Sequence, residues 1–299
     1  MKDSAVLLID CPDRKGLVAR VSSLLYERGA NILHADQHQD HELGLFFMRV
    51  EWGLGPAEGN LASAPAAQAL LQGFDLEGFK AAFAPLAAEL EMRWQLTASA
   101  RLPKVALFCS QYLHCMADLL HRWRSGELLC EIPLIVSNHR DVEKLAAFYG
   151  IPFEYVGITA ASRAEAEKRQ LELLESKGID LVVLARYMQI LSPAFVERYP
   201  ARIINVHHSF LPAFTGAKPY HAAHARGVKL IGATSHYVTE VLDDGPIIEQ
   251  DVARISHRDQ VEDLVARGRD LERIVLSRAV RWHLDRRILC YGNKTVVFD

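Results

Sequence analysis

The chain divides into two blocks with different spacing of apolar residues. In the first, a short apolar run at 5–9 predicts a buried strand, and apolar residues from Leu17 onward recur on one helical face until Gly29. We then expect two strands at 32–36 and 43–52 and a Gly-, Ala- and Pro-rich loop at 53–73. A helix at 76–90 and a last strand at 92–97 follow. This β-α-β-β-α-β order is typical of an α/β sandwich whose helices cover one face of the sheet.

The second block alternates apolar strands with amphipathic helices. Strands are expected at 105–109, 134–136, 153–156, 181–184 and 203–206. Helices are expected up to Arg124, at 142–149 and at 163–177. This alternation predicts right-handed crossovers and a mostly parallel, doubly wound, Rossmann-like sheet. A long C-terminal helix is expected over 260–286, with its charges on a solvated face and Gly268 as a candidate break.

These patterns predict an α/β protein with two domains. We place the first over residues 1–98, a linker at 99–104 that contains Pro103, and the second over 105–299. The total length of 299 residues suits two domains of ordinary size.

Composition narrows the function classes. A net charge of −3, from 34 basic and 37 acidic residues, gives no support for nucleic-acid binding. No apolar run reaches ~18 residues, so no membrane span is expected. Five cysteines without a CxxC pair indicate neither a metal site nor a disulfide framework, and they favour a cytoplasmic location.

Two polar clusters carry candidate chemistry. Asn205 and His207 end an apolar strand and point the same way, because side chains repeat every second residue. An amide and an imidazole on one face can both donate to a developing oxyanion. The second cluster holds Ser235, His236 and, seven residues after His236, Asp243. A carboxylate there could act as a general base or orient a histidine.

Each cluster also has an ordinary explanation. A single histidine after a strand is more often a structural hydrogen-bonding group than a catalyst, and Asp-Asp-Gly-Pro at 243–246 is by itself a turn. His207, His208 and Asp243 could instead hold a metal ion. Considered one at a time, the motifs leave these alternatives open.

Taken together, the motifs resemble the folate-dependent formyltransferase family over about 104–299. The matching segments are Asn-Val-His-His-Ser-Phe-Leu-Pro at 205–212, Gly216, Gly-Ala-Thr-Ser-His at 232–236 and Leu-Asp-Asp-Gly-Pro-Ile at 242–247. The resemblance implies catalytic roles for Asn205, His207 and Asp243. It implies supporting roles for His236, Ser209 and Gly245.

The segment 185–191 looks like the loop in which this family holds the pteridine ring through main-chain groups. The folate contacts that the resemblance implies are Arg186, Met188, Gln189 and Leu191, and an ordinary loop is the alternative. Lys218 is a candidate partner for the glutamate tail, with a solvated lysine as the alternative.

The first block resembles an ACT domain, a ferredoxin-like regulatory module that binds amino acids. The resemblance rests on Cys-Pro-Asp-Arg-Lys-Gly-Leu-Val at 11–18 and Gly-Ala-Asn-Ile at 29–32. It implies an amino-acid effector, with glycine and methionine as candidates, held at Asp13, Gly16 and Asn31. It also implies a homo-oligomer, a dimer of dimers or larger; a purely structural module is the alternative.

An ACT domain joined to this second domain resembles the hydrolytic branch of the formyltransferase family. That branch implies hydrolysis of 10-formyltetrahydrofolate to formate and tetrahydrofolate, without a permanently bound cofactor, which supplies formate for purine synthesis and balances one-carbon folate pools. Segment 109–115 contains no glycine and so offers no phosphate-binding loop. Its bulky groups, with Tyr220 and His221, could fill the space of an amine acceptor and leave water as the nucleophile. A transferase acting on another amine and a catalytically silent amino-acid sensor remain the alternatives.

Overall fold

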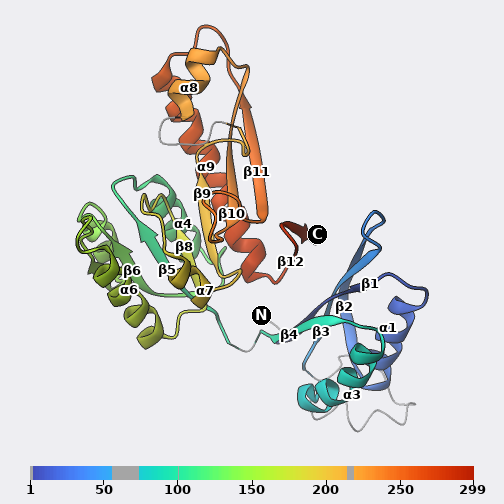
Figure 1. Cartoon of the computed structure of the whole chain (residues 1–299). Coiled ribbons are helices and arrows are strands. Elements are labelled where there is room, and N and C mark those ends of the chain that lie inside the picture. Colours follow the sequence, from blue (N-terminus) through green and yellow to red (C-terminus); the bar gives the residue numbers. More distant parts are fainter. Residues whose placement is uncertain (1–2, 56–73, 100, 214–218) are drawn as a thin grey trace. The chain divides into compact units, whose positions relative to one another are not determined.

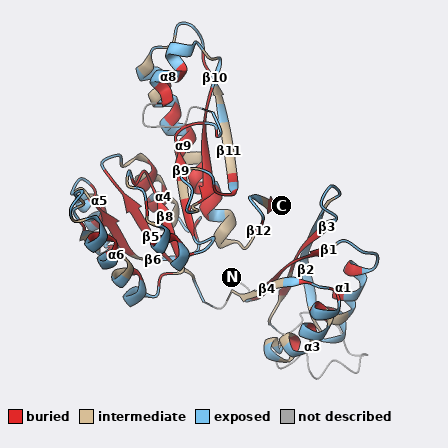
Figure 2. Cartoon of the chain, viewed as in Figure 1, coloured by how far each residue is buried: buried red, intermediate tan, exposed pale blue. Residues whose placement is uncertain are grey.

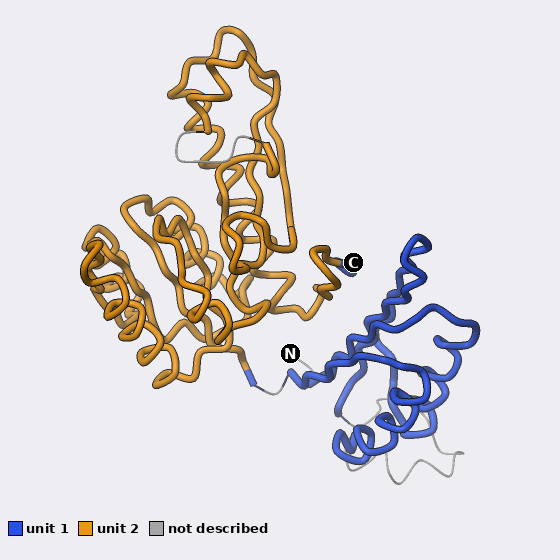
Figure 3. The backbone as a smooth tube through the Cα atoms, viewed as in Figure 1, with its two compact units in different colours: residues 1–101, 296–299 blue, residues 102–295 orange. Residues whose placement is uncertain are grey.

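A computed structural model of the protein describes residues 3–55, 74–99, 101–213 and 219–299. The chain forms two compact units, one of residues 1–101 with 296–299 and the other of residues 102–295 (Figure 3).

The first unit contains a four-stranded antiparallel sheet with strand order β2-β3-β1-β4. Its elements along the chain are β1 (Ser4–Pro12), α1 (Leu17–Glu27), β2 (Asn31–Asp40), β3 (Leu45–Gly53), α3 (Leu76–Glu89) and β4 (Arg93–Ala98) (Figure 1). The β-α-β-β-α-β order predicted from the sequence is therefore present. The loop expected at 53–73 lies almost entirely outside the described residues.

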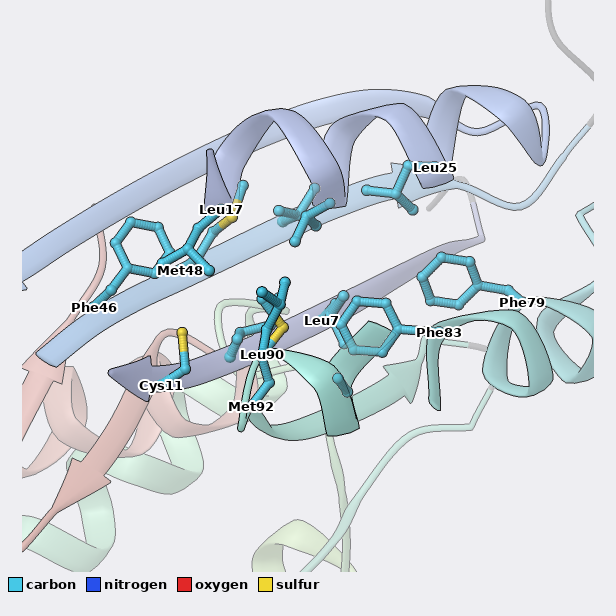
Figure 4. Close-up of a cluster of buried hydrophobic side chains, with 14 of the residues drawn as sticks. Leu7, Cys11, Leu17, Leu25, Phe46, Met48, Phe79, Phe83, Leu90 and Met92 are labelled. Atoms are coloured by element: carbon cyan, nitrogen blue, oxygen red, sulfur yellow. The ribbon is translucent and has the colours of Figure 1, made fainter. Parts of the chain in front are cut away.

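The core of this unit lies between the sheet and its helices. Leu17 and Leu25 of α1 face Leu7 of β1, and Phe79 and Phe83 of α3 complete the cluster (Figure 4). This arrangement follows from the helical spacing of the apolar residues, which places them on the stripe that faces the sheet.

The second unit is built on a seven-stranded sheet with order β11-β10-β9-β8-β5-β6-β7. Its strands are β5 (Lys104–Cys109), β6 (Glu131–Ser137), β7 (Phe153–Tyr155), β8 (Leu181–Leu184), β9 (Ile203–His207), β10 (Leu230–Tyr237) and β11 (Ile247–Arg254). Its helices are α4 (His114–Arg124), α5 (Glu143–Tyr149), α6 (Arg163–Lys177), α7 (Pro193–Arg198), α8 (Pro219–Arg226) and α9 (Val261–Leu284). Two short strands follow and pair with each other, β12 (Ile288–Tyr291) and β13 (Lys294–Val297).

Five strands of this sheet, β7-β6-β5-β8-β9, are parallel, which confirms the mostly parallel α/β class. The strands β10 and β11 add two antiparallel members that the sequence analysis did not predict. Central strands are buried on both faces while the helices expose their outer surfaces, as expected for a sheet covered on two sides (Figure 2).

The strand order changes direction between β5 and β8. The chain runs from β5 outward through β6 and β7, then returns to place β8 on the other side of β5. Ligands in such sheets bind beyond the carboxyl ends of the strands at this switch point. Two loops meet there, because Ser110 N–H donates to the Arg186 carbonyl at 3.1 Å and Met188 N–H donates to the Ser110 hydroxyl at 3.0 Å.

The C-terminal helix α9 is one continuous helix of 24 residues that packs against β9, β10 and β11. The expected break at Gly268 is therefore wrong, because this glycine is a buried packing position and the helix passes through it. None of the described helices combines the length and apolar character that a membrane span requires.

Candidate active site

The two predicted clusters meet because β10 runs antiparallel beside β9. In this register Asn205 pairs with His236, and His207 pairs with Thr234. Paired residues share a face of the sheet, so the side chains of Asn205, His207 and His236 extend toward the same space. The sequence alone could not show this meeting, because it depended on the unpredicted strand β10.

Asp243 approaches these side chains from the loop after β10. Its Oδ2 accepts from Nδ1 of His207 at 3.2 Å, and its Oδ1 lies 3.6 Å from Nε2 of His236. The backbone of Asp243 is left-handed, with φ of 55°. Such a conformation is uncommon outside glycine, and aspartate is among the residues that tolerate it best.

The residue that allows this loop path is Gly245. A Cβ atom there would lie 1.8 Å from the Tyr237 carbonyl oxygen. The chain is fixed at the same place because Tyr237 N–H donates to the Pro246 carbonyl at 2.9 Å. Any larger residue at Gly245 would therefore displace the loop that carries Asp243, and the supporting role of Gly245 in catalysis stays a prediction.

His236 orients the amide of Asn205. Its Nδ1 lies 2.8 Å from the Tyr237 carbonyl, which can only accept, so Nδ1 carries the proton and Nε2 of the neutral ring is an acceptor. The Asn205 amide lies 3.3 Å from that Nε2 and donates to it. One N–H of Asn205 is thereby fixed on His236, which leaves the second N–H for a ligand.

His207 has one engaged nitrogen and one open nitrogen. Its Nδ1 donates to Asp243, while its Nε2 is buried and has no hydrogen-bond partner anywhere in the described part of the chain. Buried polar atoms are rarely left unpaired, and in active sites such an atom commonly awaits a ligand. The open nitrogen is thus placed to receive an oxygen of a bound molecule.

The electrostatics of Asp243 keep it ionised. Burial alone would raise its pKa, but the hydrogen bond from His207 is the largest of the opposing effects, which together hold the pKa well below its usual range. A carboxylate with so low a pKa is a weak base but a strong partner for a positive charge on His207.

These groups line a cavity of about 540 Å³. Its lining includes Asn205, His207, His236 and Asp243. It also includes the four residues predicted to contact folate, Arg186, Met188, Gln189 and Leu191. Met188 and the neighbouring Ile190 are 47% and 54% exposed, which is a large apolar exposure beside a cavity. The size of the cavity and its apolar wall suit an aromatic ring system.

Several predicted residues lie apart from this cavity. The Ser209 hydroxyl donates to the Ala213 carbonyl at 2.7 Å, so it stabilises the turn that follows β9. His221 is exposed on α8, and the expectation that it fills space near the reacting group is therefore wrong, because a neighbouring helix position, Tyr220, faces inward instead. Lys218 lies outside the described residues.

A buried charge cluster, which the sequence pattern did not predict, lies beside the cavity. Glu272 of α9 is 1% exposed, so the expectation of a wholly solvated charged face is wrong at this position. Its partners are His114, Tyr220 and Arg186. The spacing of apolar residues contained a signal, because position 272 falls on the stripe of Leu264, Gly268, Leu271, Val275 and Leu276.

Metal binding was the open alternative for the histidines. Among the described residues, the single group with metal-ligand spacing is His114, Cys115 and Glu272, while His207, His208 and Asp243 do not form one. This group fits a metal poorly, because Arg186 is already paired with the carboxylate and burial raises the pKa of the Cys115 thiol well above its usual value.

The three predicted effector residues of the first unit are exposed. Gly16 directly precedes α1 and has φ of 88°, and Asp13 accepts from the Gln39 side chain at 3.1 Å. Asn31 is the first residue of β2. A site at these residues stays a prediction, since the structure gives no contact that joins all three.

The fold and the site together define a formyl transferase domain preceded by an ACT domain. Residues 103–280 match the formyl transferase family and residues 5–51 match the ACT domain family. A formyltetrahydrofolate deformylase from Synechocystis sp. is 52% identical over 99% of this chain and 98% of the relative. The chain belongs to the formyltetrahydrofolate deformylase family.

Solved structures agree with this assignment. The crystal structure of a formyltetrahydrofolate deformylase from Pseudomonas syringae pv. tomato has a TM-score of 0.91 and 48% identity, over 100% of this chain and 95% of that one. A glycinamide ribonucleotide transformylase 1 from Symbiobacterium toebii has a TM-score of 0.64 and 28% identity, over 69% of this chain and 98% of that one.

Proposed function

We propose that the protein hydrolyses 10-formyltetrahydrofolate to formate and tetrahydrofolate. The observation that carries this proposal is the buried Nε2 of His207, which has no hydrogen-bond partner among the described residues and belongs to a side chain that lines the cavity beside Asn205 and Asp243. An amide, an imidazole and a carboxylate around one open space are the groups that addition of water to a formyl carbon requires.

The folate lies in the 540 Å³ cavity with its pteridine ring against residues 186–191. Main-chain groups of this loop hold the ring, while the exposed side chains of Met188 and Ile190 supply apolar contact. This position brings the formyl group, which extends from N10, toward Asn205 and His207. In the proposed reaction the formyl group is part of the substrate, so no permanently bound cofactor is required.

Hydrolysis begins with attack of water on the formyl carbon. The new C–O bond generates an oxyanion, to which protonated His207 donates from Nε2 and Asn205 donates from its second N–H. Asp243 stabilises the imidazolium and orients the water, a role that its low pKa favours over permanent uptake of a proton. As the C–O bond forms, the water gives up one proton, which Asp243 takes up transiently. The C–N10 bond then breaks, N10 receives that proton, and formate and tetrahydrofolate leave.

An assay of the purified protein with 10-formyltetrahydrofolate and no amine tests this function. Formate and tetrahydrofolate are expected in equal amounts. His207→Ala is expected to remove the activity without loss of fold, while His221→Ala, which changes an exposed histidine, is expected to retain it. Release of formate only when an amine is present would support a transferase instead.

A transferase is the second candidate because the catalytic domain is similar to the transformylase from Symbiobacterium toebii. The loop after β5 argues against a phosphorylated acceptor. Residues 109–115 contain no glycine, and the Ser110 hydroxyl donates to Asn138 at 2.7 Å instead of facing an open phosphate site.

The ACT domain supports regulation by an amino acid. We place glycine or methionine at Asp13, Gly16 and Asn31, where main-chain N–H groups at the start of α1 can meet a carboxylate. Paired ACT sheets would make the enzyme a homo-oligomer, a dimer of dimers or larger. Formate release measured with and without each amino acid, together with the mass in solution, tests both points.

The released formate serves purine synthesis, and its release balances the one-carbon folate pools. All five cysteines are free, which favours a reducing compartment, and we place the reaction in the cytoplasm. Growth of a strain that lacks the gene, with and without added formate or purines, tests this role. Growth without either supplement would contradict it.

A further inference from the structure

The carboxylate of Glu272 is enclosed by groups from three other parts of the second unit. Its Oε1 accepts from the Tyr220 hydroxyl at 2.8 Å, and its Oε2 accepts from Nε2 of His114 at 2.8 Å. Nε of Arg186 lies 3.3 Å from the same Oε2. The side chain of Glu272 is 2% exposed, so the carboxylate has internal partners and no access to a ligand.

Burial of this charge is compensated by its partners. Desolvation alone would raise the pKa of Glu272, but His114, Arg186 and Tyr220 together hold it below the usual value. An ionised carboxylate with well-placed donors fixes those donors in turn, because removing any of them leaves a buried charge short of a partner. Tyr220 is therefore held in one position.

Gly268 makes this position of Tyr220 possible. It lies one helical turn before Glu272, and a Cβ atom there would lie 2.0 Å from the Tyr220 hydroxyl oxygen. The tyrosine ring thus lies directly against the backbone of α9. Glycine is unfavourable within a helix, and here its place is explained by the close approach of this ring.

Tyr220 lies one side chain away from the reacting group. Its ring centroid is 6.0 Å from that of His208, and the His208 ring is 5.1 Å from the ring of His207. His208 and Arg186 line the 540 Å³ cavity, while Tyr220 lies behind His208 and, with His208, lines a second, apolar cavity of about 370 Å³. A molecule that approached the reacting group through this second cavity would have to pass Tyr220 and His208.

We propose that Tyr220, fixed by Glu272, His114 and Arg186, is the specificity-determining wall that keeps amines from the formyl carbon. Water, being small, reaches the carbon past this wall. The inference rests on the proposed hydrolysis and explains why a site related to transferases would release formate. It assigns to Glu272 a positioning role, since it acts through Tyr220.

Removal of the wall should let an amine compete with water. In Tyr220→Ala, glycinamide attacks through its amino nitrogen, a C–N bond forms to the formyl carbon, and the C–N10 bond breaks. The amine loses one proton and N10 gains one, so the products are N-formylglycinamide and tetrahydrofolate. No further reactant is needed.

The experiment measures the ratio of N-formylglycinamide to formate with 10-formyltetrahydrofolate and a fixed excess of glycinamide. The wild-type ratio should equal the background without enzyme, and Tyr220→Ala should raise it roughly tenfold or more, the scale on which a pocket discriminates by size. Tyr220→Phe keeps the ring but loses its hydrogen bond to Glu272, so it should raise the ratio less than Tyr220→Ala does. His221→Ala, at the exposed neighbouring position, should retain the wild-type ratio.

A folded Tyr220→Ala protein with the wild-type ratio of N-formylglycinamide to formate would refute the proposed role of Tyr220. Tyr220→Leu, which leaves a smaller cavity, provides the same measurement if the alanine variant does not fold, and a ratio unchanged in Tyr220→Leu would overturn it as well. Absence of formate from the wild-type protein without amine would instead overturn the proposed hydrolysis, so the two failures are distinguishable.

Discussion

The negative charge of Asp243 is the feature of the active site that one substitution tests most directly. Asp243→Asn keeps the size of the side chain and removes its charge. It also places an amide where the Nδ1 donor of His207 now finds an acceptor at 3.2 Å. The substitution therefore removes the group that stabilises a protonated His207.

The distance between Asp243 and His207 sets the expected loss of transition-state stabilisation in Asp243→Asn. Two opposite unit charges 3.2 Å apart attract by about 5 kcal/mol at an effective dielectric constant near 20 and by about 1 kcal/mol in bulk water. The side chain of Asp243 is 15% exposed, so its environment lies between these limits. Asp243 supports His207, which is the oxyanion donor, and loss of such a donor typically costs about 2.7–4 kcal/mol. This cost lies between the two attraction energies, and we therefore expect kcat to fall by about 10²–10³-fold.

The assay follows formate from 10-formyltetrahydrofolate under saturating and limiting substrate, so that kcat and KM are separated. Because Asp243 acts on the transition state, kcat and kcat/KM should fall together while KM changes little. The matched control is Asp244→Asn, which removes a charge from the adjacent, exposed aspartate. This variant should retain the wild-type rate.

A folded Asp243→Asn protein with turnover within about threefold of wild type would refute the reasoning, since that change corresponds to less than ~1 kcal/mol. An equal loss in Asp244→Asn would also refute it, because the effect would then follow from the net charge of the loop.

The remaining predictions concern the oxyanion donors, one glycine and acid stability. Asn205→Ala and His207→Ala should each lower kcat at least ~100-fold, and the double variant should lose less than the product of the two, as measured by formate release. Gly268→Ala should lower Tm although helix propensity alone favours alanine by about 1 kcal/mol, because the new Cβ meets Tyr220 at 2.0 Å; a higher Tm would contradict this packing. Burial lowers the pKa of His283 from 6.5 to about 3, so the unfolded chain binds the proton first as the pH falls. The free energy of unfolding should therefore fall by up to ~1.4 kcal/mol per pH unit below pH 6.5, and His283→Gln should flatten this slope in urea titrations.

Local patterns were sufficient for most elements of the fold. The helix at 163–177 and the strand at 181–184 match α6 and β8 at both ends, because helical spacing and an uninterrupted apolar run leave few alternatives. The short helices α7 and α8 were missed, since six and eight residues are too few for a periodic pattern to stand out. The strands β10 and β11 were not predicted, because polar residues such as Ser235 and His236 interrupt the apolar run that marks a buried strand.

The candidate site was predictable to the extent that it depends on strand alternation and motif spacing. Both place Asn205 and His207 on one face without any knowledge of tertiary structure. The position of Asp243 depended on an antiparallel register and on Gly245, where a side chain would meet the Tyr237 carbonyl. Only the resemblance between whole motifs carried that information before the structure did.

Glu272 shows why the rest could not be predicted. A glutamate in a charged helix is ordinarily solvated, and it becomes an internal group only when donors from distant segments arrive at the same point. Here those donors come from α4, from α8 and from the loop after β8, at sequence separations of 158, 52 and 86 residues. Since none of the three positions predicts the others, the cluster is a property of the fold. We therefore expect a variant that disrupts this cluster to alter which nucleophile reaches the formyl carbon, while activation of the formyl group by the catalytic residues is retained.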